Sequence, residues 1–220
     1  MITKPDYETA ATKALEILEI RNIRTLPIMP LPILKEYPRV MVQTFASAAE
    51  ELSMKRSDLV SLFGRNQDAA TFRIDMEDYD YCVIYNQYLP FEIIWRGIAR
   101  ELGHIILSHD GSTRSTEARM AEAMCFANHL LCPRPVIYML QQSGIPLTMN
   151  VLTSVTGCSD SCVKSMRNIP GTNVSKDLNR KIHDQFAKCI RNFINFQRLS
   201  PVEDHPALID FGTYMDGYEE

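Results

Sequence analysis

Strand-forming and helix-forming segments are segregated along this chain, and their order limits the folds open to it. The strand candidates all precede Pro90 and are the β-branched and aromatic segments 39–45, 69–74 and 81–85. From Pro90 onward, apolar residues recur at helical spacing almost without a break. Strands followed by a run of helices are typical of α+β folds. We therefore expect an α+β fold with a small, mostly antiparallel sheet and a helical carboxyl-terminal half.

Apolar periodicity, ended by proline and glycine, predicts nine helices. The segment 91–107 has the widest apolar stripe, which suits a central helix packed on several sides. The expected helices are 7–20, 31–36, 46–63, 91–107, 116–131, 136–142, 148–156, 160–167 and 175–199.

Charge is unevenly distributed over the 220 residues. The formal net charge is −4, so no global field favours nucleic acid, and residues 201–220 hold six acidic residues and no Lys or Arg. Residues 151–167 have the cadence of a helix-turn-helix, but their few basic residues argue against phosphate contacts, so DNA binding is not expected. We expect a domain over 1–143, a helical extension packed on it over 144–200, and an acidic tail over 201–220.

The amino-terminal residues lack the apolar core of a signal peptide, and no stretch reaches the roughly 20 apolar residues that span a bilayer. We expect a cytoplasmic protein that makes no membrane contact. The six cysteines are then expected as reduced thiols. Cys158 and Cys162 are close in sequence, but no second pair or nearby histidine completes a zinc-binding set.

One local pattern suggests chemistry. Arg100-Glu101-Leu102-Gly103-His104 is one residue short of the zinc-protease signature H-E-x-x-H. In that signature, residues i and i+4 share a helical face, so two imidazoles reach one metal, and the glutamate takes a proton from metal-bound water. Alone, E-x-x-H also describes a hydrogen-bonded histidine in a partly buried helix. However, Glu122 follows His104 by 18 residues on the next expected helix, and a helical hairpin can return its carboxylate to the same point.

The surrounding residues resemble the ImmA/IrrE family of zinc metallopeptidases. The resemblance covers roughly residues 80–135 and runs through the segments 83–86 (Val-Ile-Tyr-Asn), 89–90 (Leu-Pro), 98–110, 122–127 (Glu-Ala-Met-Cys-Phe-Ala) and 130–133 (Leu-Leu-Cys-Pro). It implies a zincin-like metallopeptidase fold whose central active-site helix is 91–107. It further implies Glu101 as general base and His104 and Glu122 as zinc ligands. Met124 replaces an asparagine that is frequent beside the third ligand, a change of modest expected effect.

Arg100 stands where the family has its first histidine ligand. A guanidinium has no lone pair and stays protonated. At about 4 Å from a divalent ion and an effective dielectric of 20, it is opposed by roughly 8 kcal/mol. Zinc is therefore the cofactor if the protein is active, and no cofactor is expected if Arg100 abolishes binding.

Three side chains are candidates to replace the missing ligand, namely His109, Asp110 and His129. None has the i, i+4 relation to His104 on the same helical face. A different hypothesis places Arg100 between Glu101 and Glu122 as a cation in place of zinc, with a bidentate pair to Glu122. The alternative is that Arg100 points to solvent beside a collapsed pocket.

Two functions follow from the resemblance. In the first, favoured because of Arg100, the protein is a pseudoenzyme that binds a regulatory protein or peptide without cutting it. In the second, it is an active zinc metallo-endopeptidase, a hydrolase that cleaves a transcriptional repressor in stress or mobile-element control, as part of bacterial or phage regulation. A helix-turn-helix repressor is the partner that the resemblance implies in both cases.

Overall fold

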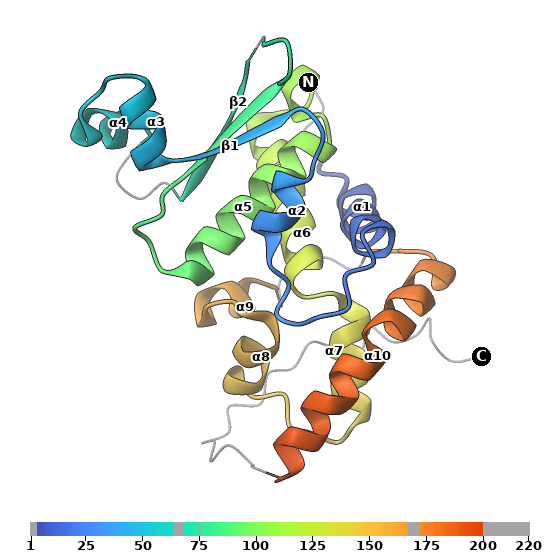
Figure 1. Cartoon of the computed structure of the whole chain (residues 1–220). Coiled ribbons are helices and arrows are strands. Elements are labelled where there is room, and N and C mark those ends of the chain that lie inside the picture. Colours follow the sequence, from blue (N-terminus) through green and yellow to red (C-terminus); the bar gives the residue numbers. More distant parts are fainter. Residues whose placement is uncertain (1–3, 64–67, 75, 167–171, 200–220) are drawn as a thin grey trace. The chain divides into compact units, whose positions relative to one another are not determined.

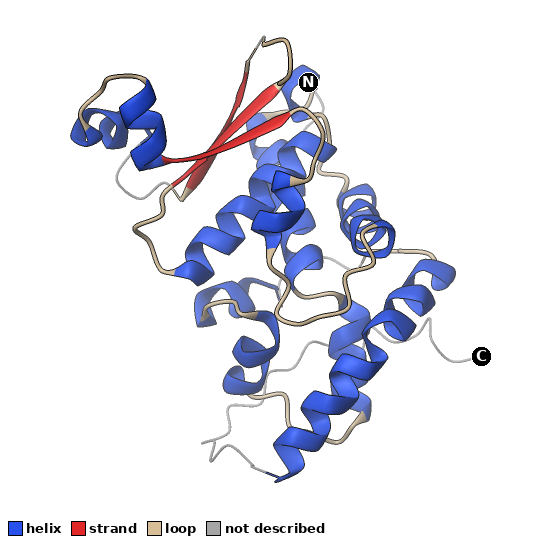
Figure 2. Ribbon diagram, viewed as in Figure 1, coloured by secondary structure: helices blue, strands red, loops and turns tan. Residues whose placement is uncertain are grey.

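The computed structural model describes residues 4–63, 68–74, 76–166 and 172–199. Within them the chain is α+β, with three short strands before Pro90 and helices in most of the remainder (Figures 1 and 2). The expected class is therefore confirmed at this level, while the acidic tail 201–220 lies outside the described residues. The elements are α1 (Tyr7–Ile20), α2 (Pro30–Lys35), β1 (Val40–Thr44), α3 (Phe45–Glu51), α4 (Arg56–Phe63), β2 (Ala69–Arg73), β3 (Tyr81–Tyr85), α5 (Phe91–Ile106), the 3-10 helix η1 (His109–Gly111), α6 (Thr116–Leu131), α7 (Arg134–Gln142), α8 (Met149–Thr156), α9 (Asp160–Met166) and α10 (Lys176–Leu199).

The single helix predicted over 46–63 is wrong, because the segment forms α3 and α4 with a break between them. The break is a left-handed helix end: Ser53 has φ 52°, and the Met54 amide donates to the Ala49 carbonyl at 2.9 Å. At the other end of α3, the Thr44 hydroxyl accepts from the Ser47 amide at 3.0 Å. The sequence did not reveal this helix end, because a left-handed position is usually recognised by a glycine and here it is occupied by Ser53.

The sheet has the order β1-β3-β2 and is mixed, which corrects the expectation of a mostly antiparallel sheet. Strand β3 pairs antiparallel with β2, with Thr71 opposite Val83, and parallel with β1, with Val42 opposite Val83. Parallel neighbours need a long crossover. The chain between β1 and β3 contains α3, α4 and β2, which makes that crossover possible.

The two faces of the sheet carry different partners. Cys82 and Ile84 join the buried side chains of α3 and α4 in one apolar cluster around Phe45. Because side chains alternate along a strand, Thr71 and Val83 lie on the opposite face, where α5 packs against β2 and β3. This second face positions the candidate site.

The chain forms two compact units. The first comprises Met1–Pro5 and Met29–Ala127, the second Asp6–Ile28 and Asn128–Glu220, and the division falls within α6. These are units of packing, so the expected sequence domains 1–143 and 144–200 stay a prediction. No helix in the described part of the chain combines the length and apolar character needed to cross a membrane.

The second unit is built on α10, which packs against α1 and α7. Its apolar stripe, expected from the sequence, is buried through Ile182, Phe186 and Ile190. Gly157, with φ 66°, ends α8 as a left-handed cap. The six cysteines, all in the described part of the chain, form no disulfide; five are buried, and Cys189 is partly exposed.

Close contact between α5 and α6 depends on Gly103. A Cβ at this position would lie 3.0 Å from Cδ1 and 3.1 Å from Cβ of Phe126, which is fully buried. We expect G103A to lower the free energy of unfolding by about 1–3 kcal/mol, although alanine favours helix by about 1 kcal/mol. G111A is the control, since a Cβ at Gly111 meets nothing within 4 Å. Equal denaturant midpoints for the two variants would contradict this account of the helix contact.

Candidate functional site

Arg100 is held on the buried face of α5 by two carboxylates. Its Nη2 donates to Asp68 Oδ1 at 2.8 Å, to Glu101 Oε1 at 2.7 Å and to the Ala69 carbonyl at 2.9 Å. Its Nε donates to Glu101 Oε1 at 2.9 Å, and Nη1 donates to Asp68 Oδ2 at 3.3 Å. The side chain is 16% exposed. Arg100 therefore does not point to solvent.

Asp68 reaches Arg100 because the backbone around it is anchored. The Asn86 amide, just after β3, donates to the Asp68 carbonyl at 2.8 Å. The Ala69 amide donates to Asp68 Oδ1 at 2.9 Å. A Cβ at Gly97 would lie 2.7 Å from Asp68 Cγ, so the glycine on α5 makes room for this carboxylate.

Arg100 and Glu101 each stabilise the charged form of the other. Burial opposes ionisation of Arg100, but the carboxylates of Glu101 and Asp68 outweigh that effect and raise the pKa of Arg100. Burial raises the pKa of Glu101 above its ordinary value, opposed by Arg100 and by the Thr71 hydroxyl, which donates to Glu101 Oε2 at 2.7 Å. Both carboxylate oxygens of Glu101 are thus occupied by donors from the protein.

A second polar chain connects His104 with Glu122. His104 Nδ1 lies 2.8 Å from His109 Nδ1, and His109 Nε2 lies 2.9 Å from Glu122 Oε2. Arg114 Nη1 pairs with Glu122 Oε1 at 2.7 Å. The carboxylate requires Nε2–H on His109, so a neutral His109 accepts at Nδ1 from Nδ1–H of His104.

A sharp turn after α5 brings His109 back to this helix. Ser108 has φ 52° and ψ 48°, a left-handed conformation that β-carbon-bearing residues rarely adopt. The Arg119 Nη1 donates to the His109 carbonyl at 3.0 Å and fixes η1 against α6. His109 is 3% exposed as a result.

These side chains do not fit a zinc ion as they stand. Two ligands bound tetrahedrally at about 2.0–2.1 Å lie roughly 3.3 Å apart, whereas the His104 and His109 nitrogens are at hydrogen-bond distance. His109 also faces His104 and Glu122 with opposite ring nitrogens, so its ring lies between the two expected ligands. Across residues 4–63, 68–74, 76–166 and 172–199, no group of three His, Cys, Asp or Glu side chains is placed to hold a metal.

Among the three candidate substitutes for the missing ligand, only His109 contacts the expected ligands. Asp110 accepts from Arg73 Nη1 at 2.6 Å and from the Tyr81 hydroxyl at 3.0 Å. His129 is buried, with Nε2 3.3 Å from the Thr172 hydroxyl. His104 and Glu122 thus both contact the imidazole of His109.

The ion pair expected for Arg100 is formed in part. Its guanidinium pairs with Glu101, as expected, but the bidentate pair with Glu122 is wrong. Asp68 takes that place, and Arg114 supplies the cation for Glu122. Position 100 faces the start of β2, whereas Glu122 is reached from the segment before α6.

Three residues of the site were not identified from the sequence: Asp68, Thr71 and Arg114. Asp68 precedes β2 and Arg114 precedes α6, in segments that carry no motif. Thr71 shares its sheet face with Val83, and only the strand register directs it to α5. The only sequence signal for Thr71 was the alternation of side chains along β2, which sets the face of the sheet on which it lies.

Comparison with family models, with curated proteins and with solved structures found no match to this chain.

Removal of Arg100 should destabilise the fold strongly. R100A leaves two buried carboxylates without their cation, so we expect the free energy of unfolding to fall by about 3–5 kcal/mol. Arg73 is the matched control, because it also pairs with an aspartate but is 71% exposed. R73A should cost less than about 1 kcal/mol. Similar denaturant midpoints for R100A and R73A would rule out a buried, mutually dependent pair.

Acid should destabilise the fold through His104. Burial, then the neighbouring His109 and Arg100, lower the pKa of His104 from 6.5 to about 4. Between these values the unfolded chain binds a proton that the folded chain does not, so stability falls as pH drops from about 6.5 to 4, by roughly 3 kcal/mol in total. In H104Q this part of the pH dependence should disappear, whereas H183Q, which removes an exposed imidazole, should keep it. Urea titrations at several pH values measure the difference.

Proposed function

We propose that this protein is a metallopeptidase-like pseudoenzyme of the ImmA/IrrE type that binds a regulatory protein in the cytoplasm without cutting it. The observation that carries the proposal is the His109 ring between His104 and Glu122. Three of the positions on which peptidase chemistry depends, 100, 104 and 122, are bound to protein groups instead of being free for a metal.

The family part of the proposal is supported by the order of the motifs and by their placement. Glu101 and His104 lie on α5, and Glu122 lies on the next long helix, α6. His104 and Glu122 both contact His109. Two helices that return a glutamate to the neighbourhood of E-x-x-H are what the resemblance implies for a zincin-like fold.

The loss of cleavage is supported by the state of Glu101. A general base needs a carboxylate oxygen free to accept a proton from water. Oε1 of Glu101 accepts from Arg100, and Oε2 accepts from Thr71. Burial raises the pKa of Glu101, but both of its oxygens are engaged by protein donors, so neither is free to take a proton from a water molecule.

An active zinc metallo-endopeptidase that cleaves a repressor is the second candidate. It is favoured by the composition of the chain His104–His109–Glu122, which contains two imidazoles and a carboxylate in successive contact. Rotation of the His109 ring out of its bridge would give a set of the kind that catalytic zinc uses. Arg100 would remain beside this set as an unfavourable charge.

Zinc binding separates the two functions. We expect dialysed wild-type protein to hold far less than one zinc per chain, and R100H/H109A to bind zinc tightly, because it gains the first ligand and loses the bridging ring. Competition with a chelator of known affinity measures both. E122Q in the R100H/H109A background should abolish the gain, and R96H, which adds a histidine one helical turn earlier, should give none.

Stoichiometric zinc in the wild-type protein would overturn the pseudoenzyme proposal. Cleavage provides the second readout: wild-type protein supplied with zinc should leave an unfolded polypeptide intact over hours. If cleavage occurs and is lost in E101Q, the protein is an active endopeptidase and Glu101 is its base. Circular dichroism of each variant excludes misfolding as the cause of a negative result.

A further inference from the structure

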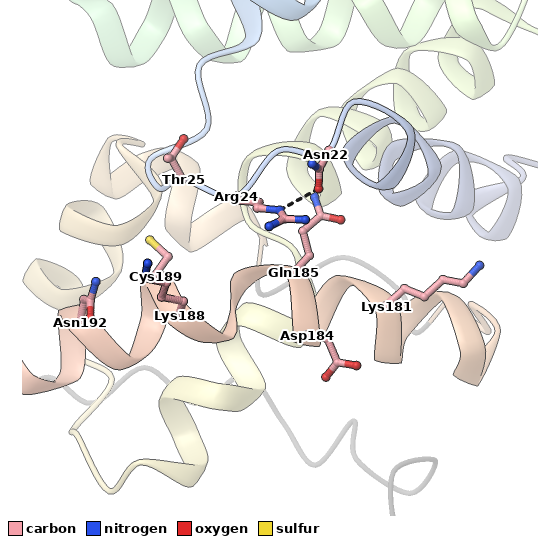
Figure 3. A pocket seen from close by; sticks show the side chains of 9 residues that line it. All are labelled: Asn22, Arg24, Thr25, Lys181, Asp184, Gln185, Lys188, Cys189 and Asn192. Atoms are coloured by element: carbon pink, nitrogen blue, oxygen red, sulfur yellow. Dashed lines mark hydrogen bonds between the residues drawn. The ribbon is translucent and has the colours of Figure 1, made fainter.

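The second unit contains an open pocket of about 620 Å³ between the end of α1 and one face of α10. Figure 3 shows the side chains that line it, among them Arg24 and Thr25 from the loop and Lys188 and Asn192 from α10. Its volume lies within the range of small-molecule sites, about 300–1,000 Å³. None of its lining residues belongs to the site on α5.

Hydrogen bonds from Gln185 connect α10 with the chain that forms the other side of the pocket. The Gln185 side-chain amide donates to the Leu18 carbonyl, in the last turn of α1, at 2.7 Å and also to the Ile23 carbonyl in the loop that follows. One half-buried side chain of α10 thereby fixes the loop that follows α1. The pocket is preformed, so a ligand need not order the loop on binding.

Two of the cations that line the pocket, Arg24 and Lys188, have no carboxylate partner among the described residues and make it locally positive. The Arg24 Nε donates to the Asn22 side chain at 2.8 Å, a bond that orients the guanidinium without neutralising it. Lys188 forms no ion pair with any described residue. Lys181, by contrast, is paired with Glu19 at 2.9 Å and Asp177 at 3.2 Å. The one lining carboxylate, Asp184, points away from Arg24 in Figure 3.

We propose that this pocket binds a phosphate group carried by a small polar molecule. Arg24 provides the planar donors that match phosphate oxygens, and Lys188 adds a second positive charge. The hydroxyl of Thr25 and the amide of Asn192 suit the polar remainder of such a ligand. Two lining cations without acidic partners disfavour a cationic ligand.

Cys189 reports on the pocket, because it lines it and the other five cysteines are buried. We expect about 10 mM inorganic phosphate, at constant ionic strength, to slow the alkylation of Cys189 by neutral iodoacetamide at least about twofold. Glycerol phosphate should act at least as strongly, which would identify a phosphomonoester, whereas stronger protection by inorganic phosphate would identify the free ion. Glycerol alone should have no effect.

The double variant R24Q/K188Q should lose this protection, whereas R180Q should keep it. Arg180 is the matched control, since it lies on α10 and carries the same charge but does not line the pocket. The ratio of alkylation rates with anionic iodoacetate and neutral iodoacetamide should also fall about two- to fivefold per cation removed. All the substituted residues are exposed, and thermal melting checks that each variant folds. Unprotected wild-type protein, or protection that survives in R24Q/K188Q, would refute the proposal.

Discussion

Each buried carboxylate of the candidate site has its own arginine, because a carboxylate held out of water without a counter-charge is strongly unfavourable. Glu101 is paired with Arg100, and Glu122 with Arg114. The first pair draws Asp68 to the surface of α5, and Gly97 leaves the space for it. Charge compensation therefore ties the start of β2 to α5, and separately ties the segment before α6 to α6.

The imidazole pair completes this arrangement. A divalent metal bound at such a site would neutralise nearby carboxylates and accept lone pairs from its ligands. In this structure, protein groups provide both the opposite charges and the hydrogen bonds. Arginines neutralise Glu101 and Glu122, and the hydrogen bonds of His109 satisfy His104 and the second oxygen of Glu122. Burial keeps the pKa of both histidines below the ordinary value, so the neutral forms dominate near pH 7. The two imidazoles therefore form a neutral hydrogen-bonded chain that ends on the Glu122–Arg114 ion pair.

The sequence predicted the elements better than it predicted their contacts. The bounds of α1, α6 and β3 were predicted correctly, because helical periodicity and strand alternation are local signals. The parallel pairing of β1 with β3 was missed, since it depends on a crossover whose direction no local pattern records. Asp68 as a partner of Arg100, and Arg114 as the partner of Glu122, were missed for a similar reason: they become neighbours of the site only through the strand register and the turn before α6.

Arg100 is therefore more than a side chain that cannot bind a metal. It has Asp68 and the Ala69 carbonyl as partners, and Gly97 leaves room for the first of them. A histidine at the same position would provide a donor for metal but would leave Asp68 without its cation, at a cost typical of a broken buried pair. A second change, at Asp68, would have to accompany it to remove that cost. Position 100 and its surroundings thus form a coupled set, in which the energetic effect of each residue depends on the others.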